Sequence, residues 1–171
     1  MSWFRRPALP DPVRRALALP ASESVLASAA LAAGSWAVAA RARLLPGAAG
    51  GTTVVRHLWS DVDRAGYDPE SATITVSWVD GAPPLALRLA DPRRTSLAQT
   101  LRERVQSSVV LSETVTFAAG LTARVAVRRD ADGELFSQVG ADPGLALTAP
   151  GVGARVDAAE GRVRSASGLP L

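Results

Sequence analysis

The chain has 171 residues, 47% of them apolar and 20% charged, which is enough for one domain with a sizeable core or a small domain with an extension. Its 19 basic residues are all arginine and exceed the 16 acidic residues by a net charge of +3, but they are spread along the chain and do not indicate a nucleic-acid partner. The absence of cysteine excludes disulfides and thiolate chemistry, and the single histidine excludes a multi-histidine metal site.

Residues 1–21 form an N-terminal arm in which arginines, large apolar side chains and prolines are mixed. The arginines of this arm are Arg5, Arg6, Arg14 and Arg15. The prolines limit any helix to about residues 12–19. Two interpretations stay open: a structural arm that packs on a sheet, or a basic amphipathic arm that lies on an anionic membrane or docks a partner.

The stretch from Val25 to Ala40 carries no charge and could be a signal peptide, a membrane anchor or part of a folded sheet. It is shorter than the roughly 20 strongly apolar residues that span a bilayer, and the prolines and acidic residues before it do not suit a secretory signal. The alternating pattern on both sides of residues 33–35 predicts a β-hairpin that ends near Pro46 and Gly47, with Arg41 and Arg43 at its solvent side. We therefore expect a cytoplasmic protein, with a location peripheral to a membrane as the alternative.

Further strands are expected at residues 52–59, 60–68, 73–79 and 85–90, separated by turn residues. Ile74, Val76 and Trp78 should point inward, and Trp36 and Trp59 should join them in the core. Asp91 and the proline after it predict the start of a helix. Its buried stripe should consist of Leu97, Leu101, Val105 and Val109.

After this helix the pattern returns to strands, at residues 114–118, 121–129 and 134–139. The last two should form a hairpin around Gly133. A weak helix is expected near residues 152–163, because three glycines each cost about 1 kcal/mol relative to alanine. The whole order predicts an antiparallel α+β fold with an arm (1–21), a core (22–112) and an extension of a β-hairpin plus a helix (113–171), packed on the core.

The segment "HLWSDVDRAGYDPESATITV" resembles the strand–strand junction of bacterial pleckstrin-homology-like (PH-like) domains. The matching positions are Trp59, Asp61, Val62, Ala65, Tyr67 and 74–76. The chain also resembles a group of uncharacterised actinobacterial proteins, in residues 9–19, 59–65 and 102–110. The resemblance implies an antiparallel PH-like sheet or barrel capped by one amphipathic helix, over about residues 22–112.

A PH-like domain implies a binding or scaffolding module for phosphoinositide-type lipids or for proteins. The lipid-binding members use basic residues around the loop that joins the first two strands, whereas residues 32–35 of this chain carry no charge. We therefore expect a non-catalytic protein-binding module, with an unknown protein partner or self-association and no cofactor. The alternative is peripheral binding to anionic lipid, for which the contact residues would be Arg5, Arg6, Arg14, Arg15, Arg41 and Arg43.

Other patterns indicate no chemistry of their own. His57 could be a general base, but no acid–nucleophile pair is identifiable around it. Asp61, Asp63 and Asp68 lack the spacing of a calcium loop. The arginines at 93–94, 102 and 104 lack aromatic neighbours that would stack on bases, and residues 140–153 match no nucleotide fingerprint. The sequence therefore predicts no catalytic, cofactor-binding or metal-binding residue and no enzyme.

Overall fold

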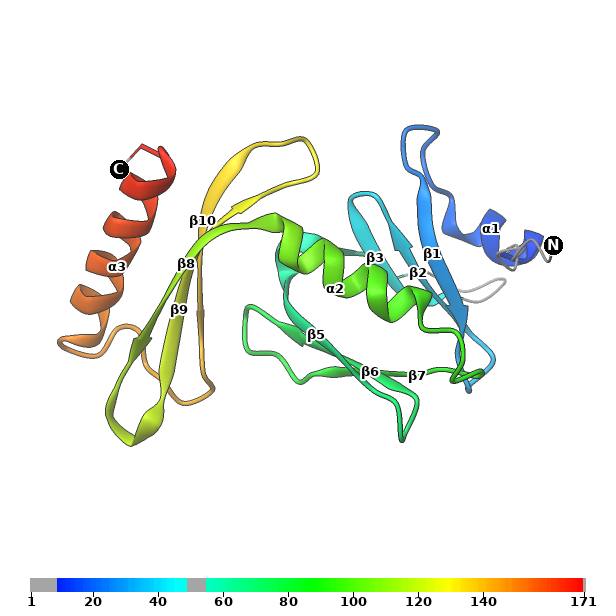
Figure 1. The fold of residues 1–171 in the computed structure, drawn as a ribbon, viewed down its shortest axis with the longest axis horizontal. Helices are drawn as coiled ribbons and strands as arrows, with labels where there is room; N and C mark the ends of the chain where they lie inside the picture. Colours follow the sequence, from blue (N-terminus) through cyan, green and yellow to red (C-terminus); the bar gives the residue numbers. More distant parts are fainter. Residues whose placement is uncertain (1–8, 49–54, 171) are drawn as a thin grey trace.

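The structure, a computed structural model, describes residues 9–48 and 55–170 (Figure 1). In these ranges the chain forms three antiparallel sheets and three α-helices. The predicted antiparallel α+β class is confirmed. None of the helices in the described ranges is both long and apolar enough to cross a membrane.

The first sheet has the order β1-β2-β3-β4 and contains the predicted hairpin. Its strands are β1 (Val25–Ala30), β2 (Trp36–Ala40), β3 (Arg43–Ala48) and β4 (His57–Leu58). The hairpin turn uses Gly34, whose φ of 83° suits glycine. The structure differs from the expected hairpin in that its second strand ends at Ala40 and a further strand, β3, contains Pro46 and Gly47. Leu44 and Leu45 of β3 are fully buried. Of the strand expected at 52–59, residues 52–54 lie outside the described residues and only β4 is formed beyond them.

The second sheet has the order β5-β6-β7. A short 3-10 turn, η1 (Trp59–Asp61), leads into β5 (Val62–Asp68), which is followed by β6 (Thr73–Trp78) and β7 (Leu85–Arg88). The predicted alternation in β6 is confirmed at Ile74 and Val76, which are fully buried. The first and second sheets are connected by one isolated antiparallel bridge, between Leu31 and Leu89. Away from this bridge the two sheets diverge.

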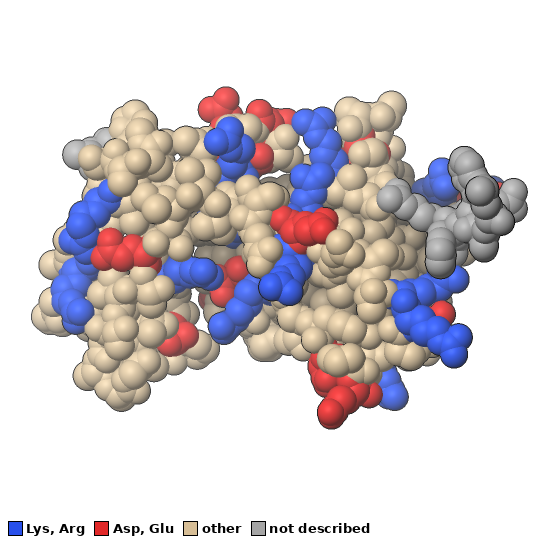
Figure 2. All heavy atoms as spheres, viewed as in Figure 1, with Lys and Arg blue, Asp and Glu red and all other residues tan. Residues whose placement is uncertain are grey.

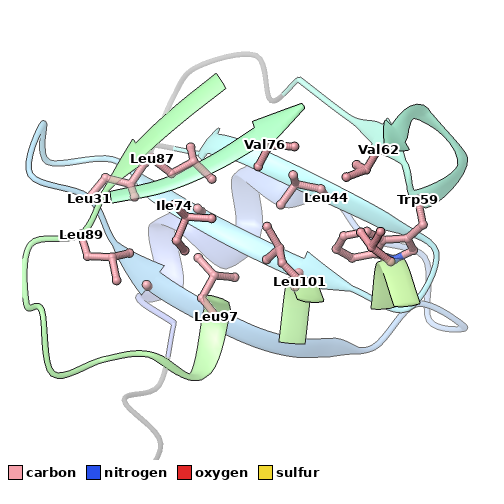
Figure 3. Packing of buried hydrophobic residues seen from close by; sticks show 14 of the residues in the cluster. Leu31, Leu44, Trp59, Val62, Ile74, Val76, Leu87, Leu89, Leu97 and Leu101 are labelled. Carbon is pink, nitrogen blue, oxygen red and sulfur yellow. The ribbon is translucent and has the colours of Figure 1, made fainter. Parts of the chain in front are cut away.

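Helix α2 (Ser96–Ser108) fills the space between the splayed sheets (Figures 1 and 3). The predicted start at Asp91 is wrong: its carboxylate accepts the amide of Arg93 at 3.0 Å in a turn that precedes the helix. The predicted stripe is confirmed in its helical part, where three side chains are buried between the sheets: Leu97, Leu101 and Val105. They share one core with Ile74 and Val76 of β6, Leu44 of β3 and Trp59 of η1. Trp59 is buried as predicted, whereas Trp36 and Trp78 are only half-buried.

Helix α1 (Asp11–Leu17) packs on the outer face of the first sheet. Val13 and Leu17 are buried against Val38 of β2 and Leu45 of β3. The helix is short, within the limit that the prolines of the arm set. Because Val13 and Leu17 are spaced by four residues, they lie on one helix face, and the arginines beside them stay exposed.

The C-terminal part forms a third sheet in the order β10-β9-β8, covered on one face by α3 (Val152–Ser167). Its strands are β8 (Val109–Thr116), β9 (Thr122–Arg129) and β10 (Leu135–Ala141). The predicted hairpin is the β9–β10 pair of this three-stranded sheet. Helix α3 has 16 residues although glycine has a low helix propensity. The burial of Val156, Ala159 and Val163 against the sheet outweighs this cost.

Candidate functional site

The six arginines predicted as contact residues do not gather in the described part of the chain. Arg5 and Arg6 lie outside the described residues. Arg14 and Arg15 are exposed on α1. On the face shown in Figure 2, arginine and acidic side chains are interspersed, and a hollow lies between the third sheet and the two sheets that enclose α2.

Arg41 and Arg43, at the end of the predicted hairpin, both contact protein atoms. Arg41 donates from Nη2 to the carbonyl oxygen of Ala131 in the β9–β10 turn, at 3.1 Å. Arg43 lies with its Nε 3.8 Å from Oε1 of Glu23, whose carboxylate also accepts the amide of Ala42 at 2.8 Å. A lipid phosphate would have to compete with these partners.

A groove of about 700 Å³ runs along the outer edge of β1, between α1 and α2. Arg14 is the predicted contact residue that lines it. Its apolar lining comes from α1, its flanking residues and β1: Leu9, Leu17, Leu19, Val25, Leu26 and Ala27. Its polar lining is on the α2 side and includes Gln99, Thr100 and Glu103, where Gln99 donates to Glu103 at 2.8 Å.

Strand β1 presents backbone hydrogen-bonding groups to this groove. Ala29 pairs with Ala37 of β2, and the amide of Leu31 donates to the carbonyl of Ser35 at 2.8 Å. Because bonding alternates along an antiparallel strand, the amide and carbonyl of Ser28 point away from β2, on the side where Ala30 accepts the amide of Ala90. Within the described ranges, no hydrogen bond satisfies the backbone groups of Ser28. The groove therefore contains an edge strand that another strand could extend.

His57 lies in a second cavity, of about 520 Å³, and stacks on the indole of Trp78 with ring centroids 4.2 Å apart. Asp61 and Asp80 line the same cavity. Each carboxylate accepts a backbone amide, that of Leu58 at 2.9 Å and that of Ala82 at 3.0 Å. Among the described residues that line this cavity there is no hydroxyl or thiol nucleophile.

Each of the three carboxylates weighed as a cation site, Asp61, Asp63 and Asp68, has a partner within the protein. Asp63 lies 3.5 Å from a guanidinium nitrogen of Arg124. Asp68 accepts the hydroxyl of Ser71 at 2.6 Å, and this hydrogen bond, with that from the amide of Glu70, lowers its pKa. Over residues 9–48 and 55–170, no group of three or more carboxylate or imidazole side chains is close enough to hold a metal ion.

The residue that sequence reasoning missed is Arg128 of β9, which is 3% exposed and joins the C-terminal sheet to the core. It donates to the carbonyl oxygens of Trp59 at 2.9 Å, Ser60 at 3.2 Å and Val62 at 2.8 Å. Burial lowers the pKa of its guanidinium. The sequence does not distinguish Arg128 from Arg129. Arg128 is buried and Arg129 exposed because of how the third sheet packs against the core around α2.

A cleft of about 480 Å³ lies between the second and third sheets, beside the contacts of Arg128, which we call the Arg128 joint. Asp63 and Trp78 line it from the core, and Arg124 and Asp142 line it from the C-terminal sheet. The hydroxyl and amide of Thr122 both donate to Asp142 at 2.8 Å and lower the pKa of that carboxyl. Its charged groups are thus largely paired within the protein.

No protein-family model matches the chain, and no curated protein or solved structure matches it significantly.

Proposed function

We propose that the protein is a non-catalytic PH-like module that binds an extended segment of another protein along the edge of β1. The observation that supports this proposal is the groove of about 700 Å³ in which the backbone of β1 lies between α1 and α2. The packing of a four-stranded and a three-stranded sheet around one amphipathic helix supports the PH-like assignment. The pairing of the candidate carboxylates with backbone amides and arginines supports the absence of catalysis.

In this proposal the partner adds a strand antiparallel or parallel to β1. Main-chain hydrogen bonds to Ser28 supply affinity, and every second side chain of the partner enters the groove. The half-buried Leu19 and Leu26 offer apolar contacts there, while Gln99 and Glu103 of α2 offer hydrogen bonds. The segment should therefore alternate apolar and polar residues.

The proposal is tested by selecting extended peptides from a random display library on the full chain and mapping the bound peptide by amide chemical shifts. A Ser28→Pro substitution removes an outward amide while the bonds from β1 to β2 stay in place. We expect the selected peptides to shift the β1 amides and to lose binding to Ser28→Pro, and to keep binding to a matched Ser28→Thr protein. Selected peptides that bind both variants equally, or a selection that yields no binder, would refute the β1 site.

The second candidate is peripheral binding to anionic lipid. It is favoured by one observation: Arg14 and Arg15 are exposed on α1 while the opposite face of that helix is buried. Co-sedimentation with vesicles of phosphatidylcholine and phosphatidylserine tests it at physiological salt, where weak charge attraction is screened. Pelleting of the full chain that is lost in an Arg14→Gln, Arg15→Gln protein would support this candidate, whereas no pelleting would exclude it.

A further inference from the structure

The third sheet also ends in an unpaired strand. Strand β8 is outermost in the order β10-β9-β8 and runs for eight residues from Val109 to Thr116. Most of its residues are exposed, and two of them are large apolar side chains, Val110 at 43% and Leu111 at 38% exposure. Long exposed edges of this kind are templates for pairing with another strand.

The register of β8 shows which backbone groups face outward. The amide of Phe117 donates to the carbonyl of Leu121 at 2.7 Å, and Val115 and Glu113 continue this register with β9. By the antiparallel alternation, the backbone groups of Ser112 and Thr114 point away from β9. In the part of the chain that the structure describes, no hydrogen bond satisfies them. A strand of another molecule could pair with these groups.

Helix α3 places two arginines beside this edge. A cavity of about 420 Å³ lies between β8 and α3, and Arg155 and Arg162 line it on the helix side. Arg162 donates to both carboxylate oxygens of Glu113, at 3.1 Å and 2.5 Å, which lowers the pKa of Glu113 and raises that of Arg162. Arg155 donates to the carbonyl of Thr116 at 3.0 Å and stacks at 4.5 Å on the ring of Phe117. Two guanidinium groups and one carboxylate leave the cavity with an excess positive charge.

We propose that the edge of β8 is a second docking site, which takes an extended segment of a partner protein with carboxylate side chains at alternate positions. An added strand directs every second side chain toward α3, where Arg155 and Arg162 bind carboxylates through their remaining N–H groups. Exposed Leu111 provides an apolar contact at the other end of the strand. This site differs from the β1 groove, so it stands independently of the function proposed above.

Charge complementarity favours this occupant over a second copy of the chain. Two copies paired antiparallel through β8 are related by a two-fold axis perpendicular to the sheet, which puts both α3 helices on the same face. Arg155 and Arg162 of one copy would then face the same arginines of the other. An acidic strand meets no such repulsion.

The test uses labelled peptides of about eight residues in which threonine alternates with glutamate, glutamine or lysine. Binding is measured by fluorescence anisotropy in the Ser28→Pro protein, so that the β1 groove does not contribute. We expect the glutamate peptide to bind best, with amide shifts at Ser112 and Thr114. A Thr114→Pro substitution, which blocks an outward amide, should abolish binding.

Two charge variants that leave the β8 backbone unchanged should change the affinity for the glutamate peptide in opposite directions. Glu113→Gln removes the carboxylate that competes for Arg162 and should tighten binding about threefold, whereas Arg162→Gln should weaken it about threefold or more. Arg88→Gln, an exposed strand arginine of β7, is the matched control and should have no effect. Equal binding of the glutamate and lysine peptides, no response to the two charge variants, or no binding of the glutamate peptide would each overturn the proposal.

Discussion

Arg128 of β9 donates from Nη1 to the carbonyl oxygen of Val62 on β5 at 2.8 Å, although the two residues are 66 positions apart in the chain. The same guanidinium reaches Ser108, the last residue of α2, whose hydroxyl lies 2.7 Å from Nη2. It also donates to Oε1 of Gln138 on β10 at 2.9 Å. One buried cation thus connects the first core, the end of its helix and the third sheet through neutral acceptors. In the described residues it forms no salt bridge.

Replacing Arg128 with methionine should destabilise the protein by about 3 kcal/mol, because several buried carbonyl groups lose their donor. Chemical denaturation followed by tryptophan fluorescence measures this, since Trp59 is next to the joint. The matched control is Arg129→Met on the same strand, where the side chain is exposed and the change should stay within about 0.5 kcal/mol. An equal decrease in the free energy of unfolding in the two variants would show that the hydrogen bonds of Arg128 add no stability.

The packing of α2 between the sheets predicts a large effect at Leu101, which is fully buried. Leu101→Ala should lower the free energy of unfolding by about 2–5 kcal/mol, through lost apolar contact and the cavity left behind. The neighbouring Arg102→Ala, at an exposed position of the same helix, serves as control and should be nearly neutral. Thermal unfolding by circular dichroism distinguishes the two.

The lowered pKa of Asp142 predicts a dependence of stability on pH. A carboxyl group with a folded pKa below its ordinary value of 3.8 contributes stability at pH above that value. The contribution is lost as pH falls through the lowered folded pKa. At neutral pH, Asp142→Asn should therefore have a lower free energy of unfolding than the parent protein. This difference should shrink as the pH decreases, which denaturation curves of both proteins at neutral and acidic pH measure. A constant difference between the two proteins across this range would contradict the proposed role of the Thr122 hydrogen bonds.

The β1–β2 turn should depend on the conformation of Gly34, whose φ is 83°. Gly34→Ala should cost about 1–2 kcal/mol, because an L side chain is strained in the left-handed region. Gly66 of β5 also has open space for a Cβ atom but lacks a positive φ, so Gly66→Ala should be neutral or slightly stabilising. Urea denaturation of the pair separates backbone strain from the general effect of removing a glycine.

The elements that could be predicted are those whose pattern is local. The alternation of β6 and the four-residue spacing of Leu97, Leu101 and Val105 each follow from the period of a strand or a helix. Strand β3 escaped prediction because tertiary pairing with β2 keeps Pro46 and Gly47 within a strand against their usual tendency. The start of α2 was misplaced because a side-chain-to-backbone bond at Asp91 serves a turn as well as a helix cap.

The candidate sites were harder to predict, because a groove is made by elements that are distant in the chain. The charge of Arg14 and its apolar neighbours are visible in the sequence, but its place beside the edge of β1 depends on how α1 packs on the first sheet. No local sequence pattern distinguishes Arg155 and Arg162 of α3 from the other arginines. Their proximity to β8 requires the third sheet, in which β8 follows directly after α2.

Helix α2 ends at Ser108 and β8 begins at Val109, so the chain passes from one unit to the next without a linker. A boundary after residue 112 therefore falls inside β8. Excising residues 22–112 would cut β8 in two and remove Arg128, leaving the carbonyl groups of η1 and β5 without their donors and exposing the end of α2. An exchange of the C-terminal sheet between two such chains would therefore have to move α2 together with the strand that follows it.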